Sequence, residues 1–201
     1  MSTCIDLLIV GVGGQGTLLA SKIIGSLAMC AGLDVKLSEV HGMAQRGGSV
    51  ETHVRISSHV ASPLVAPGSA DYVLSFEPLE AARWCHYLKD GGVLLTSSNR
   101  IWPMPVVSGA AAYPEDLDEK LRSRGVHYIA LDAQTLALEA GSARCVNIVL
   151  LGLLASRLTF SKELWLDAIA DCVPQKTLEM NKKAFLLGLE ASKDEKKHVK
   201  I

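Results

Sequence analysis

A glycine-rich turn close to the start of the chain constrains the fold more than any other feature. Residues 11–16, Gly-Val-Gly-Gly-Gln-Gly, follow an almost wholly apolar run at 5–12 and precede residues 17–30, whose apolar side chains recur at helical spacing. Glycines here let the backbone turn tightly, and they leave free N–H groups and the helix dipole facing an anion. A second strand is expected at 34–40. The pattern predicts a βαβ unit with a right-handed crossover.

The segment after the second strand departs from a plain doubly wound fold. Residues 49–57 alternate, with Val50, Val54 and Ile56 on one face and polar or charged side chains on the other. This period of two is typical of an edge or antiparallel strand with one solvated face. We expect this strand to pair with residues 59–65.

Strands and helices then alternate as in a parallel α/β fold. Strands are expected at 70–76, 92–97 and 126–131, helices at 78–88 and 115–124, and only helices from residue 133 onward. We therefore predict an α/β fold: a Rossmann-like, mostly parallel sheet with an antiparallel β insertion after the second strand and a helical C-terminal segment. Residues 1–191 are expected to form a single domain, followed by a charged C-terminal tail at 192–201. The helix at 146–158 is apolar around much of its circumference, so it either covers the sheet or forms an interface.

The charge balance, the apolar stretches and the cysteine spacing of the chain exclude several classes of function. Lys and Arg number 20 against 21 Asp and Glu, and this balance argues against a nucleic-acid binder. The first residues have no basic stretch before the apolar run, so we expect no export signal. No apolar stretch approaches the roughly 20 residues of a membrane span. We expect a soluble, cytoplasmic protein without a membrane partner. The cysteines form no C-x-x-C pair, so we expect no metal or iron–sulfur site in this chain.

A second glycine loop, residues 45–49, follows the second strand and places the Arg46 guanidinium beside two flexible backbone donors. Because loops at the carboxyl ends of parallel strands converge, we expect both glycine loops to face one crevice. Arg46 is suited to pair with a phosphate or carboxylate, or alternatively to bond loop carbonyls or a partner subunit. Glu39, at the end of the second strand, is placed to hold an adenosine ribose. The candidate cofactor-binding residues are Gly11, Gly13, Gly14, Gln15, Gly16, Glu39, Arg46, Gly47, Gly48 and Ser49.

Other polar residues at the same edge have weaker claims, and we assign no catalytic residue. His41 is either a general base or a structural histidine, and Asn99 follows a later strand with the same two readings. Glu77 and Glu80 either reach the crevice or form a solvated helix start, and we favour the helix start because acidic side chains are favoured there. The chain has no P-loop, no G-x-S-x-G, no H-E-x-x-H and no Gly-Asp-Gly…Asn-Asn pattern of a thiamine diphosphate site.

Three blocks together resemble one known family. They are the glycine turn at 11–16, the segment 38–49 with its His-Gly-Met-Ala-Gln-Arg-Gly-Gly core, and the alternating strand at 50–55. In these blocks the chain resembles the gamma-type domain of the 2-oxoacid:ferredoxin oxidoreductases, and within that family the small (beta) subunits of the indolepyruvate enzymes. The likeness extends over residues 5–189, and the His-Gly-Met-Ala-Gln-Arg-Gly-Gly core is its most specific part.

The resemblance implies a subunit of a heteromeric enzyme. The family oxidatively decarboxylates a 2-oxoacid, here an aryl-2-oxoacid, with coenzyme A to acyl-CoA, CO2 and reduced ferredoxin. Thiamine diphosphate, Mg and [4Fe–4S] clusters are carried by the large (alpha) subunit, so this chain is expected to bind none of them alone. The two glycine loops are expected to accept an anionic group or to close against the large subunit.

The sequence is also compatible with three other classes of protein. Gly11, Gly13, Gly16 and Glu39 also suit a free-standing oxidoreductase that binds NAD or FAD, although no helix is predicted between the second and third strands. The strand–helix–strand pattern at 71–94 suits an S-adenosylmethionine-dependent methyltransferase, less specifically. A non-enzymatic scaffold role is the remaining alternative.

Overall fold

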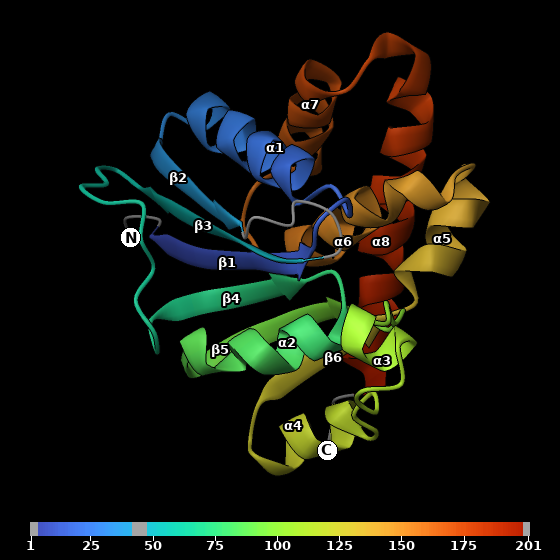
Figure 1. The fold of residues 1–201 in the computed structure, drawn as a ribbon. Helices are drawn as coiled ribbons and strands as arrows, with labels where there is room; N and C mark the ends of the chain where they lie inside the picture. The colour runs from blue at the N-terminus through green and yellow to red at the C-terminus, as the bar shows by residue number, and fades with distance from the viewer. Residues whose placement is uncertain (1–3, 42–47, 199–201) are drawn as a thin grey trace.

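A six-stranded mixed sheet in the order β2-β3-β1-β4-β5-β6 forms the centre of the molecule in a computed structural model (Figure 1). The structure describes residues 4–41 and 48–198. Strands β1, β4, β5 and β6 pair in parallel, whereas β3 is antiparallel to both of its neighbours. This arrangement confirms the predicted mixed α/β sheet. The strands are β1 (Ile5–Val12), β2 (Asp34–His41), β3 (Ser49–Ser57), β4 (Ala70–Ser75), β5 (Leu88–Ser97) and β6 (His127–Leu131).

The inserted strand β3 lies inside the sheet, between β2 and β1. Of the two predicted alternatives, an edge strand or an antiparallel strand, the antiparallel one is observed, whereas the predicted pairing with residues 59–65 was wrong. That segment forms no strand; Pro63 lies within it and has no N–H to give to a ladder. It instead covers one face of β3 as irregular chain, and the Val65 N–H donates to the buried His53 ring. The face expected to be solvated is therefore partly buried.

The insertion also changes the predicted βαβ unit. Strands β1 and β2 run in the same direction, but they are not neighbours because β3 separates them. Val12 lies opposite Ser49 in the β1–β3 ladder, and His41 lies opposite Val50 in the β2–β3 ladder. The carboxyl ends of β1 and β2 and the start of β3 therefore still meet at one edge of the sheet.

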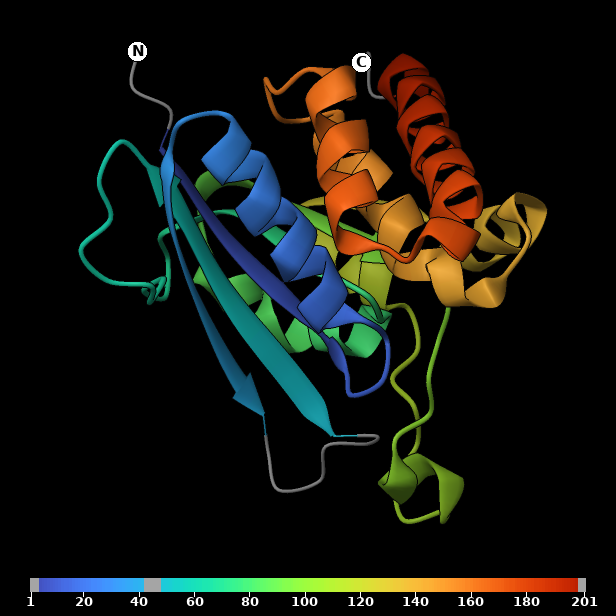
Figure 2. The same ribbon diagram turned by 90° about the horizontal axis from the view of Figure 1, so that it is seen from above.

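Helices cover both faces of the sheet (Figures 1 and 2). The α1 side carries the larger hydrophobic core, to which the C-terminal helices contribute, and the α2 side carries a smaller one. The helices are α1 (Thr17–Cys30), α2 (Pro78–Trp84), α3 (Met104–Val107), α4 (Leu117–Ser123), α5 (Ala133–Ala140), α6 (Val146–Ala155), α7 (Lys162–Cys172) and α8 (Leu178–His198). Short 3₁₀ turns are η1 (Cys85–Tyr87), η2 (Ala143–Cys145) and η3 (Gln175–Thr177).

Helix α6 is buried on all sides, with every residue from Asn147 to Ala155 inaccessible or nearly so. Of the two alternatives for this apolar helix, the core helix that covers the sheet is the one observed. Helix α8 crosses α6 closely and continues through Ser192 to His198, so most of the segment predicted as a tail is helical. None of the helices in the described part of the chain is long and apolar enough to span a membrane.

Candidate functional site

The glycine turn after β1 has the geometry that its sequence demands. Gly14 and Gly16 have φ angles of 103° and 85°, in the region that favours glycine. A Cβ on Gly11 would lie 2.8 Å from the Gln15 side-chain oxygen. That oxygen accepts from the Val12 N–H at 2.6 Å, and the Gln15 Nε2 donates to the Phe76 carbonyl at 3.0 Å. Gln15 therefore closes the turn and ties it to the end of β4.

Helix α1 begins at this turn without a side-chain cap. Its N-cap residue is Gly16, and its first turn carries no acidic side chain. The first N–H groups of a helix have no partners within the helix, and the dipole adds a partial positive charge there. The start of α1 therefore has the donors and the field that favour an anion.

The two glycine loops meet directly. The Gly13 N–H donates to the Gly48 carbonyl oxygen at 2.8 Å. The next residue, Ser49, donates its hydroxyl to the Glu80 carboxylate on α2. Gly48 and Ser49 therefore lie beside the glycine turn as expected, whereas Arg46 and Gly47 fall outside the described residues. Ligand binding by this set of residues stays a prediction.

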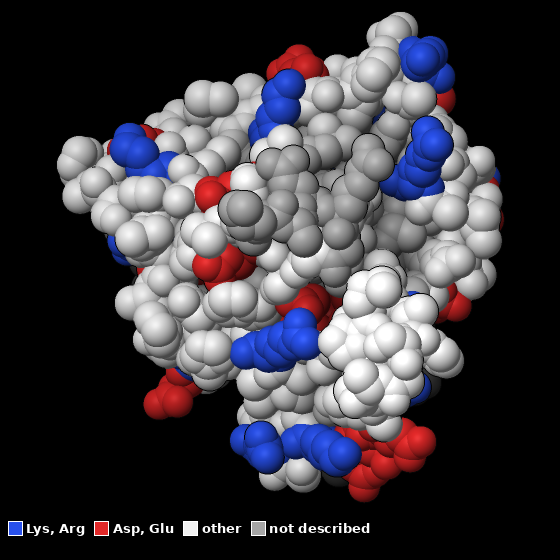
Figure 3. Space-filling view, in the orientation of Figure 1, with Lys and Arg blue, Asp and Glu red and all other residues white. Residues whose placement is uncertain are grey.

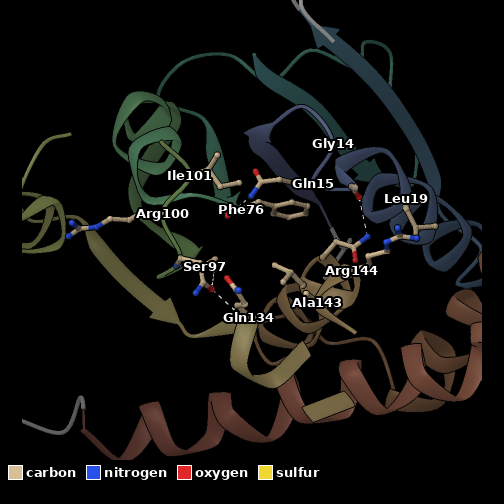
Figure 4. A pocket seen from close by; sticks show the side chains of 14 residues that line it. Gly14, Gln15, Leu19, Phe76, Ser97, Arg100, Ile101, Gln134, Ala143 and Arg144 are labelled. Atoms are coloured by element: carbon tan, nitrogen blue, oxygen red, sulfur yellow. Dashed lines mark hydrogen bonds between the residues drawn. The ribbon is translucent and has the colours of Figure 1, made fainter. Parts of the chain in front are cut away.

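A cavity of about 560 Å³ opens beside the glycine turn at the carboxyl edge of the parallel strands (Figure 4). Its walls come from the turn, from the ends of β4 and β5, and from the starts of α5 and α6. Arg144 lies next to Leu19 on one wall, and the Arg100 side chain points away from the cavity, with its guanidinium 5.1 Å from the Tyr113 ring centre. The lining residues are Gly14, Gln15, Gly16, Leu19, Phe76, Ser97, Asn99, Arg100, Ile101, Gln134, Ala143, Arg144, Val146 and Asn147.

Two asparagines build the cavity wall through hydrogen bonds. Asn147, buried at the start of α6, donates to the Gly16 carbonyl at 3.2 Å and so fixes α6 against the glycine turn. Asn99 accepts from the Ser97 hydroxyl at 2.7 Å and from the Gln134 N–H at 3.0 Å. Asn99 was predicted to lie near this edge. Asn147 and Arg144 were not predicted, and the only signal was one polar residue inside an apolar helical run.

A second hollow of about 430 Å³ lies on the other side of the turn and includes Glu39 and His41. Gly14 and Gly16 line both hollows. The single crevice expected between the two glycine loops involves Arg46 and Gly47, which lie outside the described residues, and it stays a prediction. Since β3 intervenes, Glu39 lies two strand spacings, or roughly 9.6 Å, from the glycine strand rather than one. This spacing does not match the ribose contact of a classical dinucleotide site. It counts against the NAD- or FAD-binding alternative.

Glu77 and Glu80 begin α2 as expected, but neither is solvated. They are 1% and 3% exposed. Glu77 caps the helix by accepting from the N–H groups of Leu79 and Glu80, at 2.6 and 3.0 Å. Glu80 accepts from Arg83 Nη1 at 2.6 Å, in addition to Ser49. Both carboxylates thus hold neighbouring segments in place behind the cavity rather than lining it.

The fold and the site define an α/β domain with a glycine turn, an inserted antiparallel strand and a cavity at the sheet edge. Residues 6–191 match the family described as pyruvate ferredoxin/flavodoxin oxidoreductase. The chain belongs to this family, which confirms the resemblance inferred from its motifs.

Named relatives cover nearly the whole chain. It is 43% identical over 195 residues to the indolepyruvate oxidoreductase subunit IorB of Thermococcus kodakarensis, covering 94% of this chain and 96% of that one. Identity to the subunit of the same name from Archaeoglobus fulgidus is 41%, over 92% of this chain and 93% of the other.

Solved structures agree with the fold. The gamma subunit of a keto/oxoacid ferredoxin oxidoreductase from Geobacter sulfurreducens superposes with a TM-score of 0.70 at 27% identity, over 94% of this chain and 99% of that one. A 2-oxoglutarate:ferredoxin oxidoreductase from Magnetococcus marinus, solved with 2-oxoglutarate, coenzyme A and succinyl-CoA, gives a TM-score of 0.73 at 21% identity. This chain corresponds to 32% of that longer polypeptide and matches 96% of its own length, a likeness of fold.

Proposed function

We propose that the chain is the small subunit of an indolepyruvate:ferredoxin oxidoreductase. The observation that carries this proposal is the 43% identity to a subunit of that name over nearly the full length of both chains. With a large subunit, the chain takes part in the oxidative decarboxylation of an aryl-2-oxoacid. Coenzyme A accepts the acyl group, CO2 leaves, and ferredoxin accepts the electrons.

The redox and carbanion chemistry belongs to the large subunit in this proposal. Thiamine diphosphate with Mg and the [4Fe–4S] clusters need an acidic metal site and grouped cysteines. Within residues 4–41 and 48–198, no group of three or more His, Cys, Asp or Glu side chains is arranged to hold a metal ion. The cysteines are dispersed, from exposed Cys4 and Cys30 to buried Cys145. The described residues of this chain therefore do not fit these cofactors.

The chain's own contribution is a site for an anionic group at the edge of the sheet. A 2-oxoacid carries a carboxylate, and coenzyme A carries phosphates. The uncapped start of α1 and the Arg144 side chain both border the cavity, and together they favour a negative group there. The loop at 45–49 adjoins the glycine turn at Gly48, which accepts from the Gly13 N–H. Arg46 is proposed to pair with an anionic group or with the large subunit.

Co-expression of the chain with its large subunit, followed by anaerobic purification, tests the proposal. We expect a brown complex that reduces ferredoxin with coenzyme A, with kcat/KM for indolepyruvate above that for pyruvate and 2-oxoglutarate. A colourless chain that purifies alone would contradict the subunit assignment. A complex that prefers an aliphatic oxoacid would contradict the substrate.

The loop contribution is tested by Arg46→Ala in the assembled complex, with Arg46→Lys as the charge-preserving control. We expect Arg46→Ala to lower turnover and Arg46→Lys to retain part of it. Unchanged kinetics and assembly in Arg46→Ala would remove the loop from the mechanism and favour a scaffold role.

A further inference from the structure

We infer that Glu77 is a positioning residue: it fixes one wall of the 560 Å³ cavity by holding the segment 98–116 at two points. This segment, here called the strap, runs from the end of β5 to the start of α4 and includes α3. The inference rests on the proposed function, because it assigns to Glu77 an effect on the ligand bound in the cavity.

The strap forms the cavity wall at its first residues. Asn99, Arg100 and Ile101 all line the cavity, and Figure 4 labels Arg100 and Ile101. Further along, the strap has little packing of its own, since Trp102, Met104 and Val107 are 62%, 70% and 61% exposed. In Figure 2 the part around α3 projects from the body of the molecule. In Figure 3 the surface over α3 is white, without the colours of charged side chains.

Glu77 provides two hydrogen bonds that attach the strap to the rest of the domain. One carboxylate oxygen accepts both the Ile101 N–H, at 3.3 Å, and the Tyr113 hydroxyl. A single side-chain oxygen of Glu77, the N-cap of α2, therefore holds the strap near its start and near its end. The other oxygen caps α2, so the anchor is fixed to a helix packed on the sheet.

The surroundings make this contact strong. Glu77 is 1% exposed, and hydrogen bonds to a buried carboxylate are stronger than those between neutral groups. Burial and the neighbouring Glu77 carboxylate raise the pKa of Tyr113, so its hydroxyl stays protonated and able to donate. The Arg100 guanidinium, over the Tyr113 ring, adds a cation–π contact within the strap.

Glu77→Gln separates the two roles of the carboxylate. The glutamine oxygen can still cap α2, but its NH2 group then faces the Ile101 N–H, where two donors cannot bond. Tyr113→Phe removes only the second anchor. Ser161→Ala serves as the control, because Ser161 caps α7 through the Leu164 N–H and lies outside the cavity lining.

In the assembled complex we expect Glu77→Gln and Tyr113→Phe to raise the KM of indolepyruvate or of coenzyme A by about tenfold, the effect of one lost hydrogen bond to a charged group, while kcat changes by less than about twofold. Ser161→Ala should lower Tm without moving either KM. The inference is overturned if neither KM rises in Glu77→Gln, or if its KM and kcat change only as they do in Ser161→Ala.

Hydrogen exchange separates a failure of this inference from a failure of the proposed function. In the complex, or in the full chain if it purifies alone, the Ile101 amide should exchange about tenfold faster in Glu77→Gln than in the unmodified chain. This measurement needs no substrate. Equal exchange rates at Ile101 would show that Glu77 does not hold the strap, whatever reaction the enzyme catalyses.

Discussion

The backbone N–H of Gly13 donates to the carbonyl oxygen of Gly48 at 2.8 Å, and this bond joins the two glycine loops of the chain. Val12 and Ser49, the residues beside them, lie opposite each other in the β1–β3 ladder. The bond therefore continues the ladder one step beyond the end of the sheet. The end of the second loop is therefore tied to the glycine turn by a backbone hydrogen bond.

The first prediction concerns two glycines in the turn. Gly14→Ala and Gly16→Ala both place a Cβ on a left-handed backbone, at φ 103° and 85°, and each should cost about 1–3 kcal/mol in the free energy of unfolding. Gly16→Ala should cost more, because its Cβ would lie 2.7 Å from the Asn147 Nδ2, whereas nothing lies within 4 Å at Gly14. Urea unfolding of the two variants measures the difference.

Asn147→Ala provides the check on this contact. Combined with Gly16→Ala, it removes the clash, so the double variant should be more stable than the two single losses predict, by at least about 0.5 kcal/mol. Strictly additive losses would show that Asn147 does not restrict this turn.

A second prediction concerns the charge in the cavity. Arg144→Ala should raise the KM of an anionic substrate of the complex by about tenfold, with a smaller effect at high salt because Arg144 is exposed. Arg124→Ala, which removes another exposed arginine outside the cavity lining, is the matched control. Equal KM changes in the two variants would mean that only the net charge of the chain matters.

Much of the fold was predictable because local patterns determine it. The glycine turn, the helix after it and the strand at Asp34–His41 follow from apolar spacing over short windows. The position of β3 in the sheet does not follow from such a pattern. The alternation of its side chains predicts a strand, but it does not predict that this strand pairs with both β2 and β1. Its polar face also suggested solvent, yet an irregular segment with buried Val60 and Val65 covers His53. The burial of this face of β3 depends on contacts with residues 59–65, and no local sequence pattern predicts those contacts.

The candidate site likewise contains residues that local sequence patterns predict and residues that only the tertiary packing brings there. Gly11–Gly16 was predictable because tight strand-to-helix turns need glycine. Arg144 and Asn147 reach the cavity only because α6 packs beside the turn, across more than half the chain. The acidic residue before Pro78 indicated a helix start, which the structure confirms. Its burial depends on the strap, whose course after β5 has no periodic pattern.

A third prediction tests the close contact between α6 and α8. A Cβ on Gly188 would lie 2.0 Å from the Val149 carbonyl oxygen, and one on Gly152 would lie 2.2 Å from the Phe185 carbonyl oxygen. Backbone atoms cannot give way as a side-chain end can, so Gly188→Ala should lower the free energy of unfolding by about 2 kcal/mol or more.

Gly25→Ala in α1 is the matched control for a helical glycine. Its Cβ would meet only the flexible end of Leu37, at 3.3 Å. Alanine favours a helix over glycine by about 1 kcal/mol, so this variant should be neutral or more stable. Gly188→Ala with unchanged stability would show that the two helices can separate without loss.

A fourth prediction concerns pH. His53 is 4% exposed, its Nδ1 accepts from the Val65 N–H at 3.2 Å, and burial lowers its pKa from the ordinary 6.5. Well above pH 6.5 the side chain is neutral in both the folded and the unfolded states, so the full stabilisation is present. As the pH falls, the unfolded chain takes up the proton first, and stability is lost until the folded pKa is passed. One titrating group can change the free energy of unfolding by at most about 1.4 kcal/mol per pH unit.

His53→Asn isolates this effect, because asparagine keeps an acceptor near the Nδ1 position and does not titrate. Urea unfolding at about pH 7 and about pH 5.5 should show a larger loss for the unmodified chain than for His53→Asn. Burial raises the pKa of Glu51 from 4.5, so stability falls as the pH rises through that group's range, the opposite direction. That contribution is common to both proteins and cancels in their difference. Equal slopes would show that the Val65 contact does not depend on a neutral His53.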